Sequence, residues 1–148
     1  GQTDTQYIYG LFLTLARELK RENGKLSFED LSTCLSLTFS TIEKMKKEMS
    51  IEAPSLYNLV LTNGKSLIAT RYSTAPEEET RSLHITSNTE CYVSEEGYLT
   101  CRPLKNSENA VLISSEVLTD NKELWREIPE NHCIMVDEDL SVDIKPLA

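Results

Sequence analysis

The stretch that decides the fold is LYNLVLTNGKSLIATRY, residues 56–72, in which two apolar runs flank Asn63-Gly64. The runs are Leu56–Leu61 and Ser66–Tyr72, and both are rich in residues typical of strands. An Asn-Gly pair is the strongest short hairpin signal, because a type I′ turn needs two residues with positive φ. The stretch therefore predicts an antiparallel hairpin, and helical patterns lie before it.

The first predicted helix runs from Thr3 to about Asn23. Thr3 and Gln6 have the spacing of a capping box, in which each side chain satisfies the other's backbone N–H, and Gly24 follows as a left-handed end residue. Its apolar residues recur at helical spacing, which predicts one buried face. They are Ile8, Leu11, Phe12, Leu15, Ala16 and Leu19.

A second helix is predicted from Ser27, as the capping residue, to about Met49. One alternative is a break at Ser36–Thr41, because the hydroxyls of serine and threonine compete for backbone hydrogen bonds. Pro54 marks the end of the helical half. The predicted buried stripe consists of Leu31, Cys34, Leu35, Thr38, Ile42, Met45 and Met49.

Strand patterns fill the chain after the first hairpin. The expected strands are Leu83–Thr86, Cys91–Ser94, Tyr98–Arg102, Ala110–Ser114, Cys133–Val136 and Leu140–Ile144, and Thr74–Thr80 is expected to be an acidic loop. Two helices followed by a run of hairpins predict the α+β class, with helices packed on a mainly antiparallel sheet.

The second hairpin brings two cysteines into register. If Glu95-Glu96-Gly97 is a three-residue loop with Gly97 in the left-handed region, Ser94 faces Tyr98 and Cys91 lies opposite Cys101. The pair is then either a cross-strand disulfide or two reduced neighbours in a sheet. The sequence leaves both alternatives open.

Composition excludes several classes of function. The net charge of −9 argues against a nucleic-acid partner, and no apolar run is long enough to span a membrane. The four cysteines form no Cys-x-x-Cys pair, and neither His84 nor His132 completes a zinc-finger spacing. We therefore expect no metal and no cofactor, and scattered cysteines favour a reducing, cytoplasmic setting.

The segment GQTDTQ, residues 1–6, places a lone carboxylate, Asp4, in the first turn of the first helix. The helix dipole and nearby N–H groups keep such a carboxylate ionised, so it is able to pair with an ammonium group. The alternative is an ordinary favourable charge at a helix start.

Several segments, taken in order, resemble the class II (N-terminal nucleophile) glutamine amidotransferases. The resemblance is nearest to the branch that contains the amidotransferase subunit of the glutathione-degradation complex. The matching segments are Gly1–Tyr7, Pro54–Leu56, Thr70–Tyr72, Ser82–His84, Ser114–Thr119 and Ile128–Asn131. Gln6 and Val117 depart from the family's glutamate and proline.

The resemblance implies a four-layer αββα sandwich, of which residues 1–148 supply a single domain or the C-terminal portion. The family's nucleophile is an N-terminal cysteine whose own α-amino group is the base, and an Asn-Gly pair forms the oxyanion site. Neither maps here, because Gly1 follows both and Asn63-Gly64 stands in the wrong order. No catalytic residue is therefore assigned to this chain.

The resemblance carries Asp4, with Thr3 beside it, over to substrate binding, because the family's aspartate holds the α-amino group of the γ-glutamyl substrate. Arg71 is a candidate for a substrate carboxylate, although such an arginine is more often a structural ion-pair partner. Ser115 and Glu116 are candidates to line the site, and their alternative is a plain surface role.

Two functions remain in competition. The first is the C-terminal part of a hydrolase that cleaves γ-glutamyl amides such as glutamine, glutathione or related peptides, with its nucleophile and oxyanion donors outside this chain. The second is a non-catalytic acidic binding or scaffolding module. Either way, we expect the chain alone to dimerise, to stay with the missing N-terminal part or a partner subunit, or to aggregate.

Overall fold

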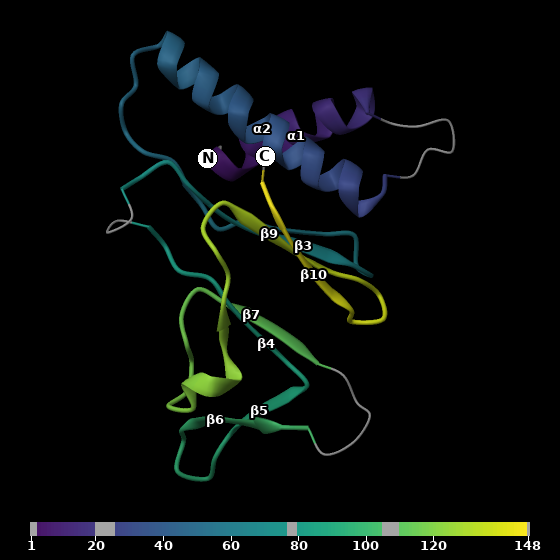
Figure 1. Cartoon of the computed structure of the whole chain (residues 1–148), viewed down its shortest axis with the longest axis vertical. Helices are drawn as coiled ribbons and strands as arrows, with labels where there is room; N and C mark the ends of the chain where they lie inside the picture. Colours follow the sequence, from purple (N-terminus) through teal and green to yellow (C-terminus); the bar gives the residue numbers. More distant parts are fainter. Residues whose placement is uncertain (1–2, 20–25, 77–79, 105–109, 148) are drawn as a thin grey trace. The chain divides into compact units, whose positions relative to one another are not determined.

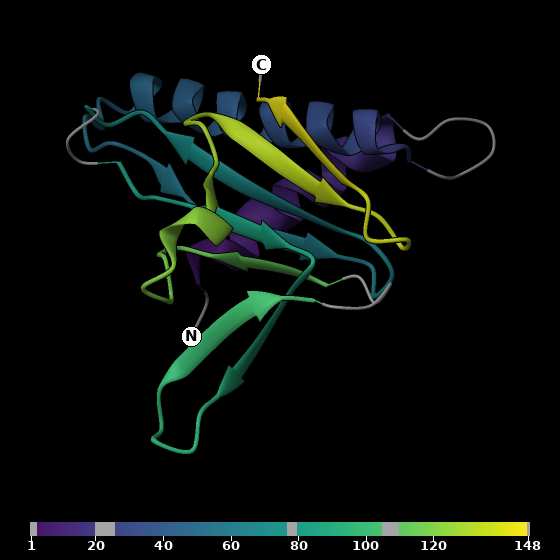
Figure 2. The same cartoon turned by 60° about the horizontal axis from the view of Figure 1, so that its bottom comes forward.

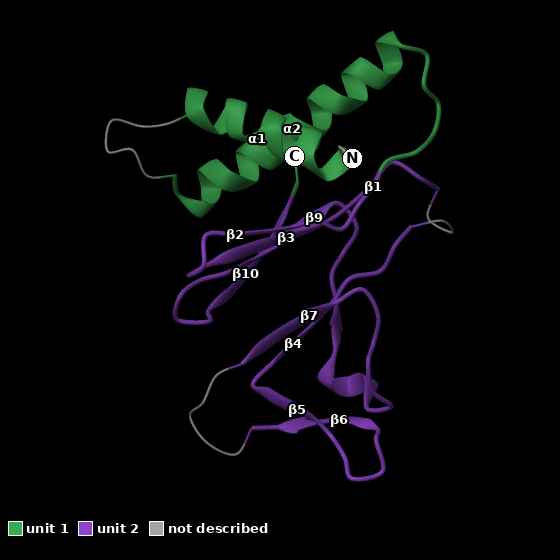
Figure 3. Ribbon diagram, turned by 180° about the vertical axis from the view of Figure 1, so that it is seen from behind, with its two compact units in different colours: residues 1–55, 147–148 green, residues 56–146 purple. Residues whose placement is uncertain are grey.

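The computed structural model describes residues 3–19, 26–76, 80–104 and 110–147 (Figure 1). The chain divides into two compact units, one of residues 1–55 with 147–148 and one of residues 56–146 (Figure 3). The predicted end of the first helix near Asn23, Gly24 beyond it, and the centre of the acidic loop lie outside the described residues.

The first unit contains two helices that pack on each other, α1 (Asp4–Glu18) and α2 (Phe28–Glu48). Thr3 caps α1 in an extended conformation, and its N–H donates to Gln6 Oε1 at 3.0 Å. Ser27 caps α2, and its hydroxyl oxygen accepts the Asp30 N–H at 3.2 Å. Both predicted helix starts are confirmed.

Helix α2 is continuous, so the alternative of a break at Ser36–Thr41 is wrong. The Thr38 hydroxyl donates to the Cys34 carbonyl at 2.7 Å, and the Ser40 hydroxyl donates to the Leu37 carbonyl at 3.1 Å. These hydroxyls therefore bond to carbonyls of the preceding turn and leave the helix intact.

The predicted buried stripe of α2 is only partly correct. Cys34, Leu35 and Thr38 are buried, but Met45 and Met49 are 52% and 68% exposed. Phe39, which the prediction omitted, is 1% exposed. Because α2 has 21 residues and α1 has 15, the last turns of α2 extend past the length that α1 can cover.

The second unit begins with the largest sheet, in the order β1-β3-β9-β10, with β2 also paired to β3. Its strands are all antiparallel to their neighbours: β1 (Leu56–Tyr57), β2 (Val60–Thr62), β3 (Leu67–Ser73), β9 (His132–Val136) and β10 (Val142–Pro146). The hairpin predicted from residues 56–72 is confirmed.

The first strand of that hairpin was predicted as one run, Leu56–Leu61, but the structure divides it into β1 and β2. Thr70 causes the interruption, because its hydroxyl accepts the Leu59 N–H at 3.2 Å and donates to the Tyr57 carbonyl at 2.9 Å. Between β1 and β2, the Thr70 hydroxyl thus takes the place of the backbone groups that would pair with a continuous strand.

The turn of the hairpin is not the predicted type I′ turn. Gly64 has φ +87°, but Asn63 is not among the residues with positive φ. The Asn63 N–H donates to the Ser66 carbonyl at 3.3 Å, so Gly64 and Lys65 are the central residues. A type I′ turn requires positive φ at both central residues, and Lys65 does not have it. The Asn63 side-chain oxygen accepts the Lys65 and Ser66 N–H groups, each at 2.9 Å, and so closes the turn.

Two smaller sheets complete the second unit. One has the order β7-β4-β8, formed by β4 (His84–Ser87), β7 (Val111–Ser114) and β8 (Arg126–Glu127); the other pairs β5 (Thr89–Val93) with β6 (Leu99–Pro103). A short 3₁₀ helix, η2 (Lys122–Leu124), precedes β8, and neither was predicted. Strand β10 begins later than predicted, because Leu140 has φ +64° in the turn before it.

The core of the second unit lies between the largest sheet and the β7-β4-β8 sheet. Its buried residues come from both sheets and their connections: Ala69, Leu83, Ile85, Ile128, Ile134 and Val136. The chain is therefore an α+β protein of two helices and mainly antiparallel strands, as predicted. No helix in the described part of the chain is long and apolar enough to cross a membrane.

Candidate functional site

Asp4 is the first residue of α1 and is exposed. The Thr3 capping interaction fixes the backbone just before it, and the Gln6 N–H donates to the Thr3 carbonyl at 3.0 Å. The carboxylate therefore sits at the positive end of the helix dipole, open to solvent. This arrangement suits the binding of an ammonium group from outside the chain.

Arg71 lies on β3, and its side chain is only 11% exposed. Its guanidinium donates to Glu127 Oε1 at 2.8 Å, to the Arg81 carbonyl at 2.9 Å and to the Ile128 carbonyl. Three different parts of the second unit are joined through this one group. These contacts fit the structural alternative for Arg71, and a role in binding substrate stays a prediction.

Ser115 and Glu116 follow β7 and are both exposed. The Ser115 carbonyl accepts a hydrogen bond from the Ser82 hydroxyl at 2.6 Å, and the Glu116 N–H donates to the Ser114 hydroxyl oxygen at 3.4 Å. Their role at a substrate site stays a prediction.

Three of the predicted site residues, Arg71, Ser115 and Glu116, are linked through hydrogen bonds of the adjacent residues Arg81 and Ser82. Arg71 binds the carbonyl of Arg81, and the next residue, Ser82, binds the carbonyl of Ser115, which precedes Glu116. Thr3 and Asp4 belong to the other unit. The local position of Asp4 is thus defined within the helices, and that of Arg71, Ser115 and Glu116 within the sheets.

None of the four cysteines is placed as a nucleophile. Cys91 and Cys101 are joined in a disulfide, and Cys34 and Cys133 are fully buried. Burial raises the pKa of the Cys34 thiol, and the nearby Asp30 carboxylate raises that pKa further. A buried thiol with a raised pKa holds little thiolate, which is the reactive form.

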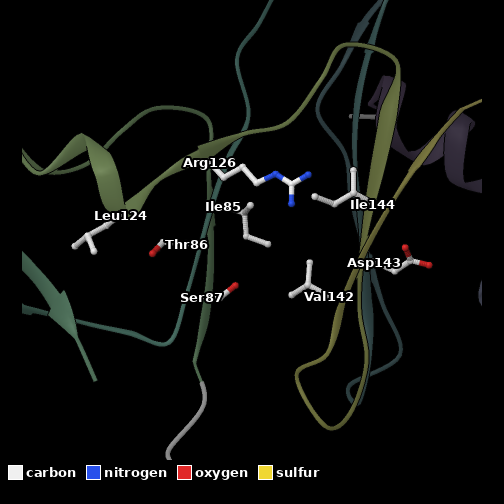
Figure 4. Close-up of a pocket in the computed structure, with 8 residues that line it drawn as sticks. All are labelled: Ile85, Thr86, Ser87, Leu124, Arg126, Val142, Asp143 and Ile144. Atoms are coloured by element: carbon white, nitrogen blue, oxygen red, sulfur yellow. The ribbon is translucent and has the colours of Figure 1, made fainter. Parts of the chain in front are cut away.

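A pocket of about 500 Å³ lies in the second unit. Figure 4 shows the side chains of Ile85 and Val142 turned toward one another across it, with the Arg126 guanidinium near Ile144. Its lining residues are Ile85, Thr86, Ser87, Leu124, Arg126, Val142, Asp143 and Ile144. None of the residues predicted to bind substrate is among them.

Sequence reasoning missed two residues whose side chains bond to residues of β3. Glu127 is the carboxylate partner of Arg71, and it lies on β8, a strand of two residues that leaves no periodic pattern. Asn131 has φ +56°, and its side-chain oxygen accepts the Ser73 N–H at 2.9 Å. The tolerance of asparagine for positive φ is the sequence signal that indicates a turn at Asn131.

Comparison with known proteins places this geometry in context. No family model matches the chain. A probable glutamine amidotransferase, DUG3, of Saccharomyces cerevisiae is 25% identical over 144 residues, which are 92% of this chain and 40% of that protein. A solved structure, a glutamine aminotransferase class-II domain protein from Silicibacter pomeroyi, covers all of this chain and 53% of its own, with a TM-score of 0.62 and 15% identity.

The fold and the helix-start motif together define a protein that resembles the class II glutamine amidotransferases. The particular similarity is to the yeast amidotransferase DUG3 in sequence and to the Silicibacter pomeroyi domain in fold. The chain spans about two fifths of the length of the first and about half of the second.

Proposed function

We propose that this chain is the C-terminal portion of a glutamine amidotransferase-like hydrolase that cleaves γ-glutamyl amide bonds. The observation that carries the proposal is Asp4, an exposed carboxylate in the first turn of a capped helix. The alignment of 92% of the chain with a probable glutamine amidotransferase supports it. Asp4, with Thr3 beside it, holds the α-amino group of the γ-glutamyl substrate.

The proposal includes a division of labour within the domain. The nucleophilic cysteine and the oxyanion donors come from polypeptide outside residues 1–148, either an N-terminal part of the same protein or a partner subunit. With that polypeptide the helices, the largest sheet and the β7-β4-β8 sheet form the four-layer αββα sandwich. The partial coverage of both relatives supports this division.

The chemistry follows from these assignments. The α-amino group of the cysteine takes the proton of its thiol, the thiolate attacks the γ-carbonyl carbon, and the oxyanion donors stabilise the tetrahedral intermediate. The C–N bond then breaks, and the amine leaves with the proton that the α-amino group held. Water then hydrolyses the thioester and releases glutamate. Asp4 contributes by positioning, because an ammonium held there keeps the γ-carbonyl of the same glutamyl group within the short reach of its side chain. Glutamine, glutathione and related γ-glutamyl peptides, in a cytoplasmic setting, are the proposed substrates.

The test is glutamate release by the longer protein that contains these residues. Replacing Asp4 with alanine removes a charge-assisted pair worth about 1.5–3 kcal/mol, so KM for γ-glutamyl substrates is expected to rise roughly 10- to 100-fold. The matched control is Glu18→Gln, an exposed acid at the other end of the same helix, which should leave KM unchanged. An unchanged KM in the Asp4→Ala variant contradicts the assignment of Asp4.

The same assay separates the hydrolase from the alternative of a non-catalytic acidic module. The encoded protein should begin with Met-Cys and carry an Asn-Gly pair upstream of Gly1. Glutamate release that disappears when that cysteine is replaced by serine supports the enzyme. A protein whose reading frame starts at Gly1 and which releases no glutamate leaves the binding module as the function.

The proposed division of the domain also predicts how residues 1–148 behave alone. Unpaired strand edges and open apolar surface should cause the isolated chain to dimerise or aggregate. Co-expression with the missing N-terminal part, or with the partner subunit that supplies it, should return a single soluble species. Sedimentation velocity measures both states, and a stable monomer of the isolated chain would count against the half-domain proposal.

A further inference from the structure

The hairpin arm, Thr89–Pro103, is a two-stranded sheet in which β5 pairs with β6 and with no other strand of the described chain (Figures 1 and 2). Its turn follows the predicted geometry. The Ser94 N–H donates to the Tyr98 carbonyl at 2.8 Å, and Gly97 has φ +87°. A hairpin of two strands is only marginally stable by itself, so the arm needs another source of order.

That source is a covalent bond between the strands. Cys91 lies directly opposite Cys101 in the β5–β6 register, and their sulfur atoms are bonded. The bond restricts the unfolded conformations of the arm. The alternative of two reduced neighbours, left open by the sequence, does not describe the structure.

The non-covalent contacts across the arm are weak by comparison. Arg102 Nε donates to Glu90 Oε2 at 3.0 Å, but both side chains are about half exposed, and exposed ion pairs contribute little. The guanidinium of Arg102 also lies 5.0 Å from the ring centre of Tyr92. Between the disulfide and the turn of the arm, Val93 and Tyr98 are 67% and 73% exposed and bury little apolar area.

The two sulfur-bearing residues differ in their access to solvent. Cys101 is 7% exposed, whereas Cys91 is partly exposed. Thiol–disulfide exchange requires an incoming thiolate to reach one sulfur atom while the other departs. Access therefore favours attack at Cys91, with Cys101 as the leaving group.

We propose that Cys91 is a thiol-exchange site for small-molecule thiols and that exchange there controls the order of the hairpin arm. An external thiolate attacks Cys91 Sγ, a mixed disulfide forms on Cys91, and the Cys101 thiolate leaves and takes up a proton. A second thiolate attacks the external sulfur of that mixed disulfide and frees the Cys91 thiol. In total, the protein disulfide is reduced to two thiols and two external thiols are oxidised to one disulfide.

The experiment treats the native protein with β-mercaptoethanol, quenches it with acid at successive times and maps the adducts by peptide mass spectrometry. The mixed disulfide is expected on Cys91 at least about tenfold more often than on Cys101, because rates of exchange depend on access. The fully reduced protein is about 2 Da heavier. Buried Cys34 and Cys133 should carry no adduct, which shows that the fold persists.

Two single variants provide a matched pair. Cys101→Ser leaves the accessible thiol and Cys91→Ser leaves the buried one, and dithiobis-nitrobenzoate should label the first at least about tenfold faster. Equal labelling of the two variants, or adducts on Cys101 as frequent as on Cys91, would overturn the assignment of Cys91.

Hydrogen exchange tests the consequence for the arm. Reduction should increase the exchange rates of amides in residues 89–103 by about tenfold or more, while those in β3 and β9 keep their protection. The Cys91→Ser/Cys101→Ser double variant should show the same pattern without reductant. Unchanged exchange in the reduced arm would show that the disulfide does not control its order, and would overturn that part of the proposal.

Discussion

Replacing Ile134 with alanine is expected to lower the free energy of unfolding by about 3 kcal/mol. Ile134 lies on β9 in the middle of the largest sheet, and it is fully buried in the core that this sheet shares with the β7-β4-β8 sheet. Removal of three carbon atoms there loses their transfer free energy and leaves a cavity that the paired strands around it cannot close.

Urea unfolding measures this loss, with the fluorescence of the buried Trp125 and circular dichroism as independent probes. The control is Val60→Ala in the same sheet, because Val60 is 63% exposed on β2 and should cost less than about 1 kcal/mol. If the two substitutions prove equally costly, Ile134 is not in a close-packed core.

Replacing Arg71 with alanine is expected to have a comparable effect, about 3 kcal/mol, for a different reason. The guanidinium is nearly buried, and it satisfies a carboxylate and two backbone carbonyls. Its removal leaves the Arg81 and Ile128 carbonyls without this donor, and an unpaired buried polar group costs free energy.

Arg71→Lys separates the structural role from a substrate-binding role. Lysine retains the charge but lacks the planar fork that reaches several acceptors at once, so much of the stability loss should remain. A pure substrate ligand would behave differently, because KM would rise in the alanine variant while urea unfolding stayed unchanged. That second pattern would contradict the structural interpretation.

The sequence was sufficient wherever the determining contacts are local. The helix starts at Thr3 and Ser27 depend on residues three positions further on, and both are present as predicted. The opposition of Cys91 and Cys101 depends on the short turn ending at Gly97, and the register follows from it. The position of Asp4 at a helix start is local in the same sense.

Sequence reasoning failed where the outcome depends on distant residues. The burial of Arg71 depends on Glu127, 56 residues away, and on a two-residue strand that has no pattern of its own. The exposure of Met45 and Met49 depends on how far α1 extends along α2. The hydroxyl of Thr70 divides a strand because of a register set across the hairpin.

By itself, then, the sequence determined the α+β class, the helix starts, the hairpins and the resemblance to class II glutamine amidotransferases. Only the tertiary structure decided that Arg71 joins three separate segments and that the cysteines of the arm are bonded. It also decided that Gly64 and Lys65 are the central residues of the first hairpin turn. The reason is physical: capping and turn signals act over a few residues, whereas burial and the pairing of charged groups depend on side chains that meet only after the sheets have assembled.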